Sequence, residues 1–227
     1  MTNDLIEELP RADRARILKS CVPVDLVLGA VLCEARQPVV HVYFPLTGFI
    51  SLVASVADHP PLEMGLIGNE GLLGVTLVLG VNLAELRGVV QGAGTALRMT
   101  GPQVRRELKR SPALHRTFSR YLYVILAQNS QSAACARFHR IEERLARWLL
   151  MTHDRAHADY FHLTHSFLAD MLGVQRSAVT IAAGALQARN LIGYTRGRIY
   201  IHNRRGLEAA SCECYQAITR DYADSMV

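Results

Sequence analysis

The apolar positions of the first hundred residues fall into many short runs that turn residues interrupt. In residues 1–20, leucine and isoleucine are interspersed with charged residues, and this pattern predicts one or two short helices. From residue 21 to residue 100 the chain is rich in valine and glycine, with its clearest apolar runs at 39–44, 49–53 and 86–90. Many short strands at this spacing predict a β-roll or jelly roll.

A single long helix is predicted next. Ser111 and Pro112 are suited to its N-cap and first helical position, and residues 113–136 contain no glycine or proline. A heptad seam, apolar in its first half and small or polar in its second, runs along Leu114, Phe118, Tyr121, Ile125, Gln128, Ser132 and Cys135. Such a seam can be buried against the same chain or against a second copy. A helix about 36 Å long favours burial of the seam against a second copy of the chain. We therefore expect residues 111–137 to be a dimerisation helix.

Beyond residue 140 the periodicity predicts shorter helices. One starts at residue 141, has an apolar face between 145 and 151, and is followed by a polar loop at 153–160. Two more helices lie within residues 163–190 and are separated by a glycine. A short helix, a glycine corner and a second helix form the pattern of a helix-turn-helix.

The residues of this segment fit the motif individually. Thr164 can cap the first helix, Gly173 can adopt the positive φ that ends it, and Val174 can fill the corner. The second helix would bury Val179, Ala183 and Leu186. Its first turns offer groups that can reach base edges or phosphates in a DNA major groove: Gln175, Arg176, Ser177 and Thr180.

Positive charge gathers in the same half of the chain. Residues 1–110 hold 11 Lys+Arg and 11 Asp+Glu, whereas residues 111–227 hold 14 and 9, a net of 14 − 9 = +5, and all these cations are arginines. Guanidinium groups make paired hydrogen bonds to phosphate and guanine. Residues 191–201 predict a β-hairpin wing that would place Arg196 and Arg198 beside phosphates. The asymmetry predicts a sensor or scaffold joined to an anion-binding domain.

The cysteines do not form a recognisable framework. Their number is five, which argues against a set of disulfides, and only Cys212 and Cys214 are close in sequence. Their spacing is tighter than the usual zinc-binding Cys-x2-Cys, and no second ligand pair lies nearby in the sequence. We therefore expect reduced structural thiols and assign no metal site, with metal binding and redox sensing left open as alternatives.

The remaining features bear on location and on catalysis. No apolar run reaches the roughly 18–20 residues of a membrane helix, and the acidic N-terminus lacks the order of a signal peptide. We expect a cytoplasmic protein without a membrane partner. A jelly roll can also bind or convert a small molecule, with the C-terminal module mediating protein contacts. Jelly-roll enzymes usually carry a metal-binding histidine set, but this roll has only His41 and His59, so we expect no catalytic residues.

The order of these elements resembles the Crp/Fnr superfamily of bacterial transcription regulators. The resemblance implies an α+β chain with a cyclic-nucleotide-binding-like sensor β-roll at 1–110, a dimerisation helix at 111–137 and a winged helix-turn-helix DNA-binding domain at 138–227. It further implies a homodimer that binds double-stranded DNA and works with RNA polymerase. The family's corner motif, Gly-x-Ser/Thr-Arg-Glu-Thr-Val, here reads Gly173-Val-Gln-Arg-Ser-Ala-Val179.

The match also shows where this chain departs from the family. Arg176 stands where the family arginine reads guanine, but Ser177 replaces the glutamate that often follows, and Ile181 replaces a second arginine. We therefore expect a different operator sequence. Thr164 and His165 fall where the family contacts phosphate.

The resemblance also implies a set of candidate effector-binding residues in the roll and on the long helix. They are Glu70, Gly71, Arg87, Gly88, Asn129 and Ser130. Cyclic-AMP-responsive members place a hydroxyl residue after the phosphate-binding arginine, whereas here Gly88 follows Arg87 and offers only a backbone N–H. Three alternatives stay open: a cyclic nucleotide, another small ligand, or no ligand, and no cofactor is assigned.

Overall fold

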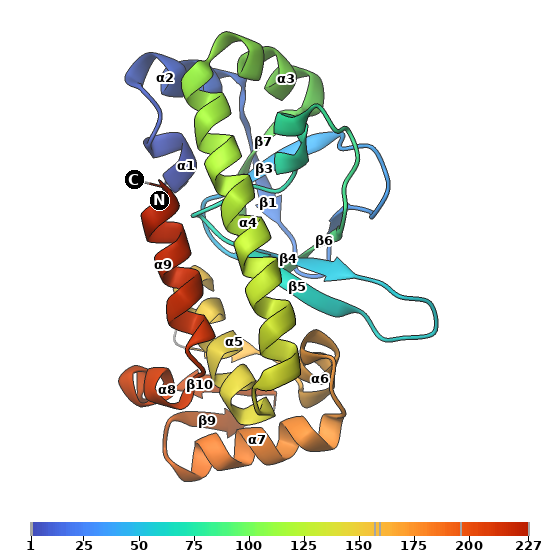
Figure 1. Ribbon diagram of the computed structural model, residues 1–227, viewed down its shortest axis with the longest axis vertical. Helices are drawn as coiled ribbons and strands as arrows, with labels where there is room; N and C mark the ends of the chain where they lie inside the picture. The colour runs from blue at the N-terminus through green and yellow to red at the C-terminus, as the bar shows by residue number, and fades with distance from the viewer. Residues whose placement is uncertain (1, 157, 159, 196, 227) are drawn as a thin grey trace.

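The first half of the chain folds into two antiparallel sheets that enclose an apolar core (Figure 1). The computed structural model describes residues 2–156, 158, 160–195 and 197–226. The sheets have the strand orders β1-β7-β3 and β2-β6-β4-β5. Their strands are β1 (Val22–Leu26), β2 (Val31–Cys33), β3 (His41–Pro45), β4 (Phe49–Ala54), β5 (Leu62–Ile67), β6 (Arg87–Gly92) and β7 (Gly94–Thr100). The predicted β-roll is therefore confirmed.

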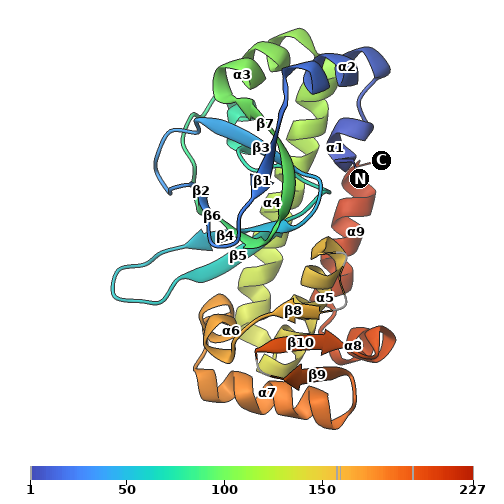
Figure 2. The same cartoon turned by 180° about the vertical axis from the view of Figure 1, so that it is seen from behind.

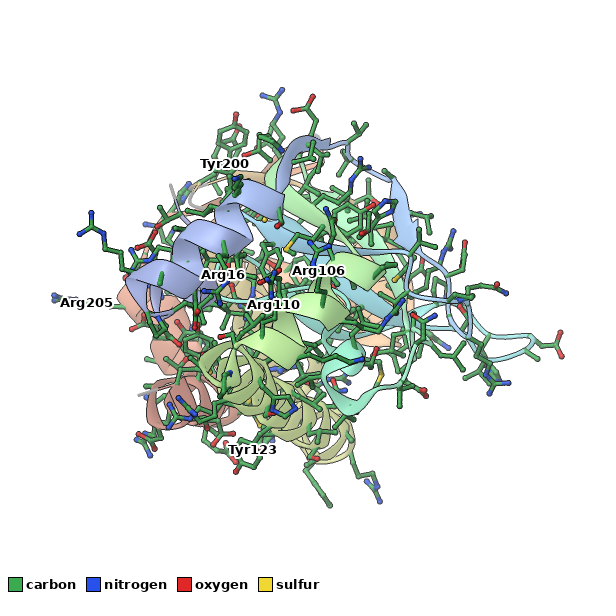
Figure 3. All side chains as sticks on the ribbon, turned by 90° about the horizontal axis from the view of Figure 1, so that it is seen from above. Arg16, Arg106, Arg110, Tyr123, Tyr200 and Arg205 are labelled. Atoms are coloured by element: carbon green, nitrogen blue, oxygen red, sulfur yellow. The ribbon has the colours of Figure 1, made fainter. Side chains whose placement is uncertain are left out.

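Short helices close one end of the roll. They are α1 (Asp4–Glu7), α2 (Arg11–Ser20), the 3-10 helix η1 (Val75–Leu79) and α3 (Gly101–Arg110). Glu107 of α3 is 2% exposed, and Arg16, Arg106 and Arg110 approach its carboxylate at 3.4, 3.5 and 3.6 Å (Figure 3). The contact with Arg16 joins α2 to α3, so the N-terminal helices are held on the roll by charge as well as by apolar packing.

The long helix α4 (Pro112–Phe138) runs beside the roll and reaches the C-terminal half (Figure 1). It begins as predicted, with the Ser111 hydroxyl accepting a hydrogen bond from the Leu114 N–H at 3.0 Å. Most of the predicted seam is buried within the chain, at Leu114, Phe118, Tyr121, Gln128 and Cys135. The expectation that this seam faces a second copy is therefore wrong, because the roll and the C-terminal helix already cover it.

The C-terminal helix α9 (Cys214–Met226) lies along α4 in both views (Figures 1 and 2). The Tyr222 hydroxyl donates a hydrogen bond to the carbonyl of Glu70 at 2.9 Å, and Met226 shares an apolar cluster with Leu5 of α1. No sequence pattern predicted this helix. Residues 214–226 thus pack on α4 and the N-terminal helices, and Tyr215 and Ile218 also belong to the core of the predicted 138–227 domain.

The other elements of the C-terminal half share one apolar core. They are α5 (Ile141–Ala156), β8 (Tyr160–His162), α6 (His165–Leu172), α7 (Arg176–Ala188), β9 (Ile192–Thr195), β10 (Arg198–Ile201) and α8 (Arg204–Ala210). Helix α5 continues into the predicted loop at 153–160, because Arg155 is buried and pairs with Glu70 of the roll at 2.8 Å. Within the described residues, no helix has the length and hydrophobicity that a membrane crossing needs.

A buried carboxylate joins the roll to the C-terminal half. Glu63 of β5 accepts hydrogen bonds from the Trp148 indole N–H and from the Ser51 hydroxyl, both at 2.6 Å. Burial raises the pKa of Glu63 to about 7, although both hydrogen bonds and the nearby Arg147 and Arg155 favour the carboxylate. The β4–β5 hairpin therefore contacts α5 through a group that titrates near neutral pH.

We predict that the stability of the protein depends on pH through Glu63. Because its folded pKa of about 7 lies above the ordinary 4.5, the native chain binds this proton more tightly than the unfolded chain does. The contribution of this proton to the free energy of unfolding is fully present below the ordinary pKa. It falls by up to about 3 kcal/mol as the pH rises through the pKa of the folded state. Chemical denaturation at about pH 5 and about pH 8 measures this fall.

The Glu63→Gln variant keeps the size of the side chain and removes the titration. We expect a smaller fall in its free energy of unfolding over the same pH interval. The Glu85→Gln variant, at an exposed position, should fall as the wild type does. If the free energy of unfolding of Glu63→Gln fell as much as that of the wild type, the pH dependence would not come from Glu63.

Candidate nucleic-acid interface

The helix α6 begins and ends as its sequence predicts. The Thr164 hydroxyl accepts a hydrogen bond from the Phe167 N–H at 3.1 Å, which caps the helix. Leu168 and Leu172 are buried, and the ring of Phe167 makes an edge contact with Trp148 of α5. The first helix of the motif is thus fixed on the C-terminal core.

A left-handed glycine forms the corner between the two helices. Gly173 has a φ of 63°, and the Val174 N–H returns to the carbonyl of Ala169 at 3.0 Å. Val174 packs partly buried against the core. A Cβ atom at Gly173 would lie only 2.9 Å from Leu62 Cδ1 of the β4–β5 hairpin. The corner therefore requires glycine for its backbone and for its contact with the roll.

The helix α7 has one buried face and one open face. Its buried residues are Val179, Ala182, Ala183 and Leu186. The predicted reading residues are all exposed or partly exposed: Gln175, Arg176, Ser177 and Thr180. Ile181, which was expected only as the replacement of a family arginine, is 75% exposed on the same face. Its position four residues after Ser177 was the signal that it belongs to this face.

Arg176 and Thr180 differ in how much of their hydrogen-bonding capacity is free. Within the described residues, the Arg176 guanidinium has no hydrogen bond or ion pair. The Thr180 hydroxyl donates to the carbonyl of Arg176 at 3.0 Å and also lies 3.0 Å from Nδ1 of His165. Because that hydroxyl hydrogen is used, Nδ1 of His165 must be the donor. Thr180 is therefore partly engaged in holding the helix-turn-helix together.

His165 connects the two helices with the following hairpin. Its ring stacks on Tyr194 with a centroid distance of 4.2 Å. Burial and the charge of Arg176 both lower the pKa of His165. A neutral ring with its proton on Nδ1 leaves Nε2 as an acceptor, which cannot donate to a phosphate. Nε2 is also buried. The predicted phosphate contact by His165 thus needs both protonation of the ring and exposure of Nε2, and its observed contacts are positioning ones.

The predicted wing follows α7. Strands β9 and β10 pair in antiparallel register, with β8 on the other side of β10. Arg198 is exposed at the start of β10, and the Leu163 N–H donates to the carbonyl of Gly197 at 2.8 Å. Arg196 lies outside the described residues. The wing is therefore tied to the first residues of the helix-turn-helix, and Arg198 is open to solvent beside it.

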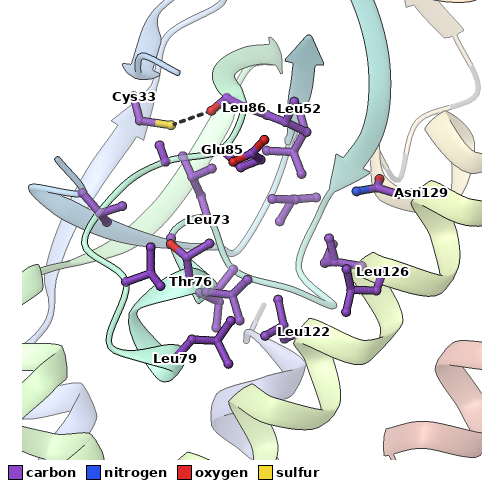
Figure 4. A pocket seen from close by; sticks show the side chains of 18 of the residues that line it. Cys33, Leu52, Leu73, Thr76, Leu79, Glu85, Leu86, Leu122, Leu126 and Asn129 are labelled. Carbon is purple, nitrogen blue, oxygen red and sulfur yellow. Dashed lines mark hydrogen bonds between the residues drawn. The ribbon is translucent and has the colours of Figure 1, made fainter. Parts of the chain in front are cut away.

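A cavity of about 340 Å³ lies between the roll and α4 (Figure 4). Its lining is mainly apolar, and Leu122, Leu126 and Asn129 reach it from α4 (Figure 4). Asn129 is the predicted effector residue that lines it. The apolar side chains of the lining were not predicted, because their spacing in the sequence is that of ordinary core residues.

The other predicted effector residues do not line this cavity. They are Glu70, Gly71, Arg87, Gly88 and Ser130. Glu70 pairs with the buried Arg155 at 2.8 Å, whereas Arg87 pairs with the exposed Glu34 at 3.3 Å. Gly71 packs under Tyr121, and Gly88 lies between Leu73 and Cys33. The Ser130 hydroxyl donates back to the carbonyl of Leu126 at 2.9 Å. The structure therefore does not bring the predicted effector residues together around one ligand.

The arrangement defines a class of protein: a β-roll, a long helix and a winged helix-turn-helix in one chain. Residues 143–210 match the family of Crp-like helix-turn-helix domains. No curated protein sequence matches the chain.

Solved structures with the same fold support this class. FixK2 from Bradyrhizobium japonicum is similar with a TM-score of 0.72 and 15% identity, over 85% of this chain and 98% of that one. The c-di-GMP-responsive global regulator CLP of Xanthomonas campestris is similar with a TM-score of 0.69 and 15% identity, over 85% of this chain and 99% of that one. A CRP-family transcriptional regulator from Thermus thermophilus is similar with a TM-score of 0.66 and 15% identity, over 83% of this chain and 96% of that one. The chain thus has the fold of Crp/Fnr regulators and carries a Crp-like helix-turn-helix DNA-binding domain, which confirms the resemblance.

We predict opposite effects for alanine at two glycines of the motif. Gly173→Ala should lower the free energy of unfolding by about 1–2 kcal/mol, because a Cβ atom is strained at positive φ and meets Leu62. Gly184 lies in α7, and a Cβ atom added there would have no neighbouring atom within 4 Å. Gly184→Ala should raise the same free energy by about 0.5–1 kcal/mol, since alanine favours helix. Urea denaturation measures both, and a shift of the same sign would contradict the corner geometry.

Proposed function

We propose that the protein is a sequence-specific DNA-binding transcription regulator that acts as a homodimer. The observation that carries this proposal is the open face of α7, where Arg176 and Ser177 begin a helix held by the Gly173 corner. A helix presented in this way fits the major groove of DNA. As a regulator, the protein would act on RNA polymerase at the same promoter.

The open face of α7 supports a particular kind of readout. The free guanidinium of Arg176 suits the paired acceptors of guanine, whereas the Ile181 side chain suits the methyl group of thymine. Ser177 is small and can donate or accept. Gly184 leaves space for close approach further along the helix. The face is nearly uncharged beyond Arg176, so base contacts rather than phosphate contacts dominate along this helix.

The outer face of α4 supports a dimer. Tyr123 and Leu126 are 59% and 58% exposed, and Tyr123 points away from the rest of the molecule (Figure 3). Leu122, Leu126, Asn129 and Ala133 repeat at steps of four and three, which is a heptad stripe. Burying such leucines contributes about 1.5–3 kcal/mol each. In a dimer packed on this stripe, the two α7 helices would need to lie about 34 Å apart to enter successive major grooves.

The cavity beside α4 supports control by a small and mainly apolar effector. Within the described residues, its lining contains no arginine or lysine. A cyclic phosphate would need such a charge or several directed donors, and Arg87 is already paired with Glu34. Leu122 and Leu126 line the cavity and also belong to the outer stripe of α4. A bound ligand would therefore act directly on the face that we assign to the dimer.

The DNA-binding proposal is tested with duplexes selected by the wild-type protein from a random pool. Arg176→Ala should reduce the preference for the selected sequence over a scrambled duplex by about 10–100-fold, since paired contacts to guanine contribute about 1–3 kcal/mol. Binding by the wild type should weaken steeply as salt is raised. Fluorescence anisotropy measures both.

The matched control is Arg116→Ala, which removes the same charge from an exposed position near the start of α4. Its preference should remain that of the wild type. A folded Arg176→Ala protein with unchanged preference would refute the assigned reading residue. Equal binding of all duplexes by the wild type would refute sequence-specific regulation itself.

The dimer proposal predicts the effect of one charge in the outer stripe. Leu126→Glu should convert the dimer to a monomer and reduce DNA affinity by at least about 10-fold, because a carboxylate would be buried at the two-fold axis. Val27→Glu, at a 64% exposed position between β1 and β2, should remain dimeric. Sedimentation equilibrium measures the mass. A monomeric wild type at micromolar concentration, or a dimeric Leu126→Glu protein, would count against this face.

A further inference from the structure

Four metal-ligating side chains converge where α4 ends and α9 begins. They are Cys135, His139, Cys212 and Cys214, and one ligand atom from each lies within 4.8 Å of all the others. Cys135 lies in the last turn of α4 and His139 caps that helix four residues later. The three cysteines are buried together. Two segments more than seventy residues apart thus contribute two ligands each.

Two of the separations between ligand atoms match those around a single tetrahedral ion, and all of them lie within 4.8 Å. The Sγ atoms of Cys135 and Cys212 are 3.5 Å apart, and Sγ of Cys214 lies 3.4 Å from Nδ1 of His139. Bonds of about 2.3 Å to sulfur and about 2.0 Å to nitrogen place tetrahedral ligands about 3.5–3.8 Å from one another. An iron–sulfur cluster holds its cysteines around several metal and sulfide atoms and needs wider separations.

The surrounding residues orient the four ligands. Nε2 of His139 lies 3.1 Å from the Glu213 carboxylate, so Nδ1 is the nitrogen that faces the sulfurs. A carboxylate bonded to the far nitrogen is the usual support of a metal-binding histidine. The side-chain amide of Gln131 donates to Sγ of Cys214 at 2.9 Å, a contact that stabilises a thiolate.

The charges around the cluster fit a bound cation. Three thiolates and a neutral histidine on a divalent ion carry a net charge of −1. Arg144 and Arg147 of α5 interact electrostatically with the Cys135 sulfur, and both are largely buried. Their positive charge offsets the remaining negative charge, so the cluster is not an uncompensated anion inside the protein.

We propose that Cys135, His139, Cys212 and Cys214 bind one Zn²⁺ ion in a structural site. Three sulfurs and one imidazole select zinc among the common divalent ions. The protein fills all four tetrahedral positions, so no position is left for a reacting water. The site is closed rather than catalytic.

The sequence by itself predicted no metal site, because Cys212 and Cys214 have no second ligand pair near them in the chain. The fold provides that pair from α4, since α9 lies along this helix. His139 was not considered as a ligand, because a single histidine four residues after a single cysteine is a weak pattern.

The position of the ion gives it a mechanical role, which rests on the proposed function. Cys135 lies in the last turn of α4, which ends at Phe138, and His139 lies in the joint before α5, which begins at Ile141. The other two ligands also hold the joint between α8 and α9. Zinc would therefore fix the direction in which the DNA-binding domain leaves α4.

Zinc binding is measured on the full, untagged chain without any DNA. The protein purified under reducing conditions and reconstituted with Zn²⁺ should contain one zinc per chain by mass spectrometry of the elements. Replacement by Co²⁺ should give the visible bands of a tetrahedral cobalt–thiolate site. Because neither measurement involves DNA, they remain decisive if the proposed DNA binding fails.

Variants separate this cluster from the other cysteines. Cys212→Ser should lose the stoichiometric zinc, whereas Cys21→Ser and Cys33→Ser, which lie outside the cluster, should retain it. Glu213→Gln should keep the ion but weaken zinc affinity by about 10–100-fold, as expected for an outer partner of the histidine.

Three results would overturn the proposal. The first is a reconstituted wild-type protein without stoichiometric zinc. This result would count against the site even if a cysteine variant failed to fold. The second is a Cys212→Ser protein that still binds one ion with unchanged cobalt bands. The third is a Cys135–Cys212 disulfide that persists under reducing conditions.

Discussion

Burial of the inner face of α4 determines how the other parts of the molecule are placed. Phe118 and Tyr121 enter the apolar cluster that the roll and the N-terminal helices share. Part of the same helix is covered by α9, whose Tyr222 reaches the carbonyl of Glu70. Because one side of α4 is used in this way, a second copy can meet only the opposite side. Packing of the roll and of α9 on one side of α4 therefore leaves the opposite side of this helix as its exposed face.

The roll also contacts the DNA-binding domain directly. Glu63 receives the Trp148 indole N–H from α5, and Leu62 lies against the Gly173 corner. The roll is thus joined to the helix-turn-helix domain through β5 as well as through α4.

The lack of cationic side chains among the described lining residues distinguishes the cavity of this roll from a phosphate site. Glu70 and Arg87 lie outside the lining and pair with Arg155 and Glu34, whereas the lining itself contains the acidic Glu85. The lining is left mainly apolar, with Asn129 at its edge on α4. The Glu70–Arg155 pair joins the roll to α5, and the Arg87–Glu34 pair joins β6 to the turn after β2.

Local patterns in the sequence determined much of the fold and of the interface. Thr164, Gly173 and the exposed start of α7 follow from capping, positive φ and helical periodicity, which involve residues only a few positions apart. The strands of the roll follow from alternation and turns in the same way. Tertiary structure alone decided which seam of α4 is buried, that α9 covers it, and that Cys135 and His139 meet Cys212 and Cys214. An apolar stripe in a sequence predicts burial of that face but does not predict which element covers it. Hydrophobic burial is non-directional, so any apolar partner satisfies it.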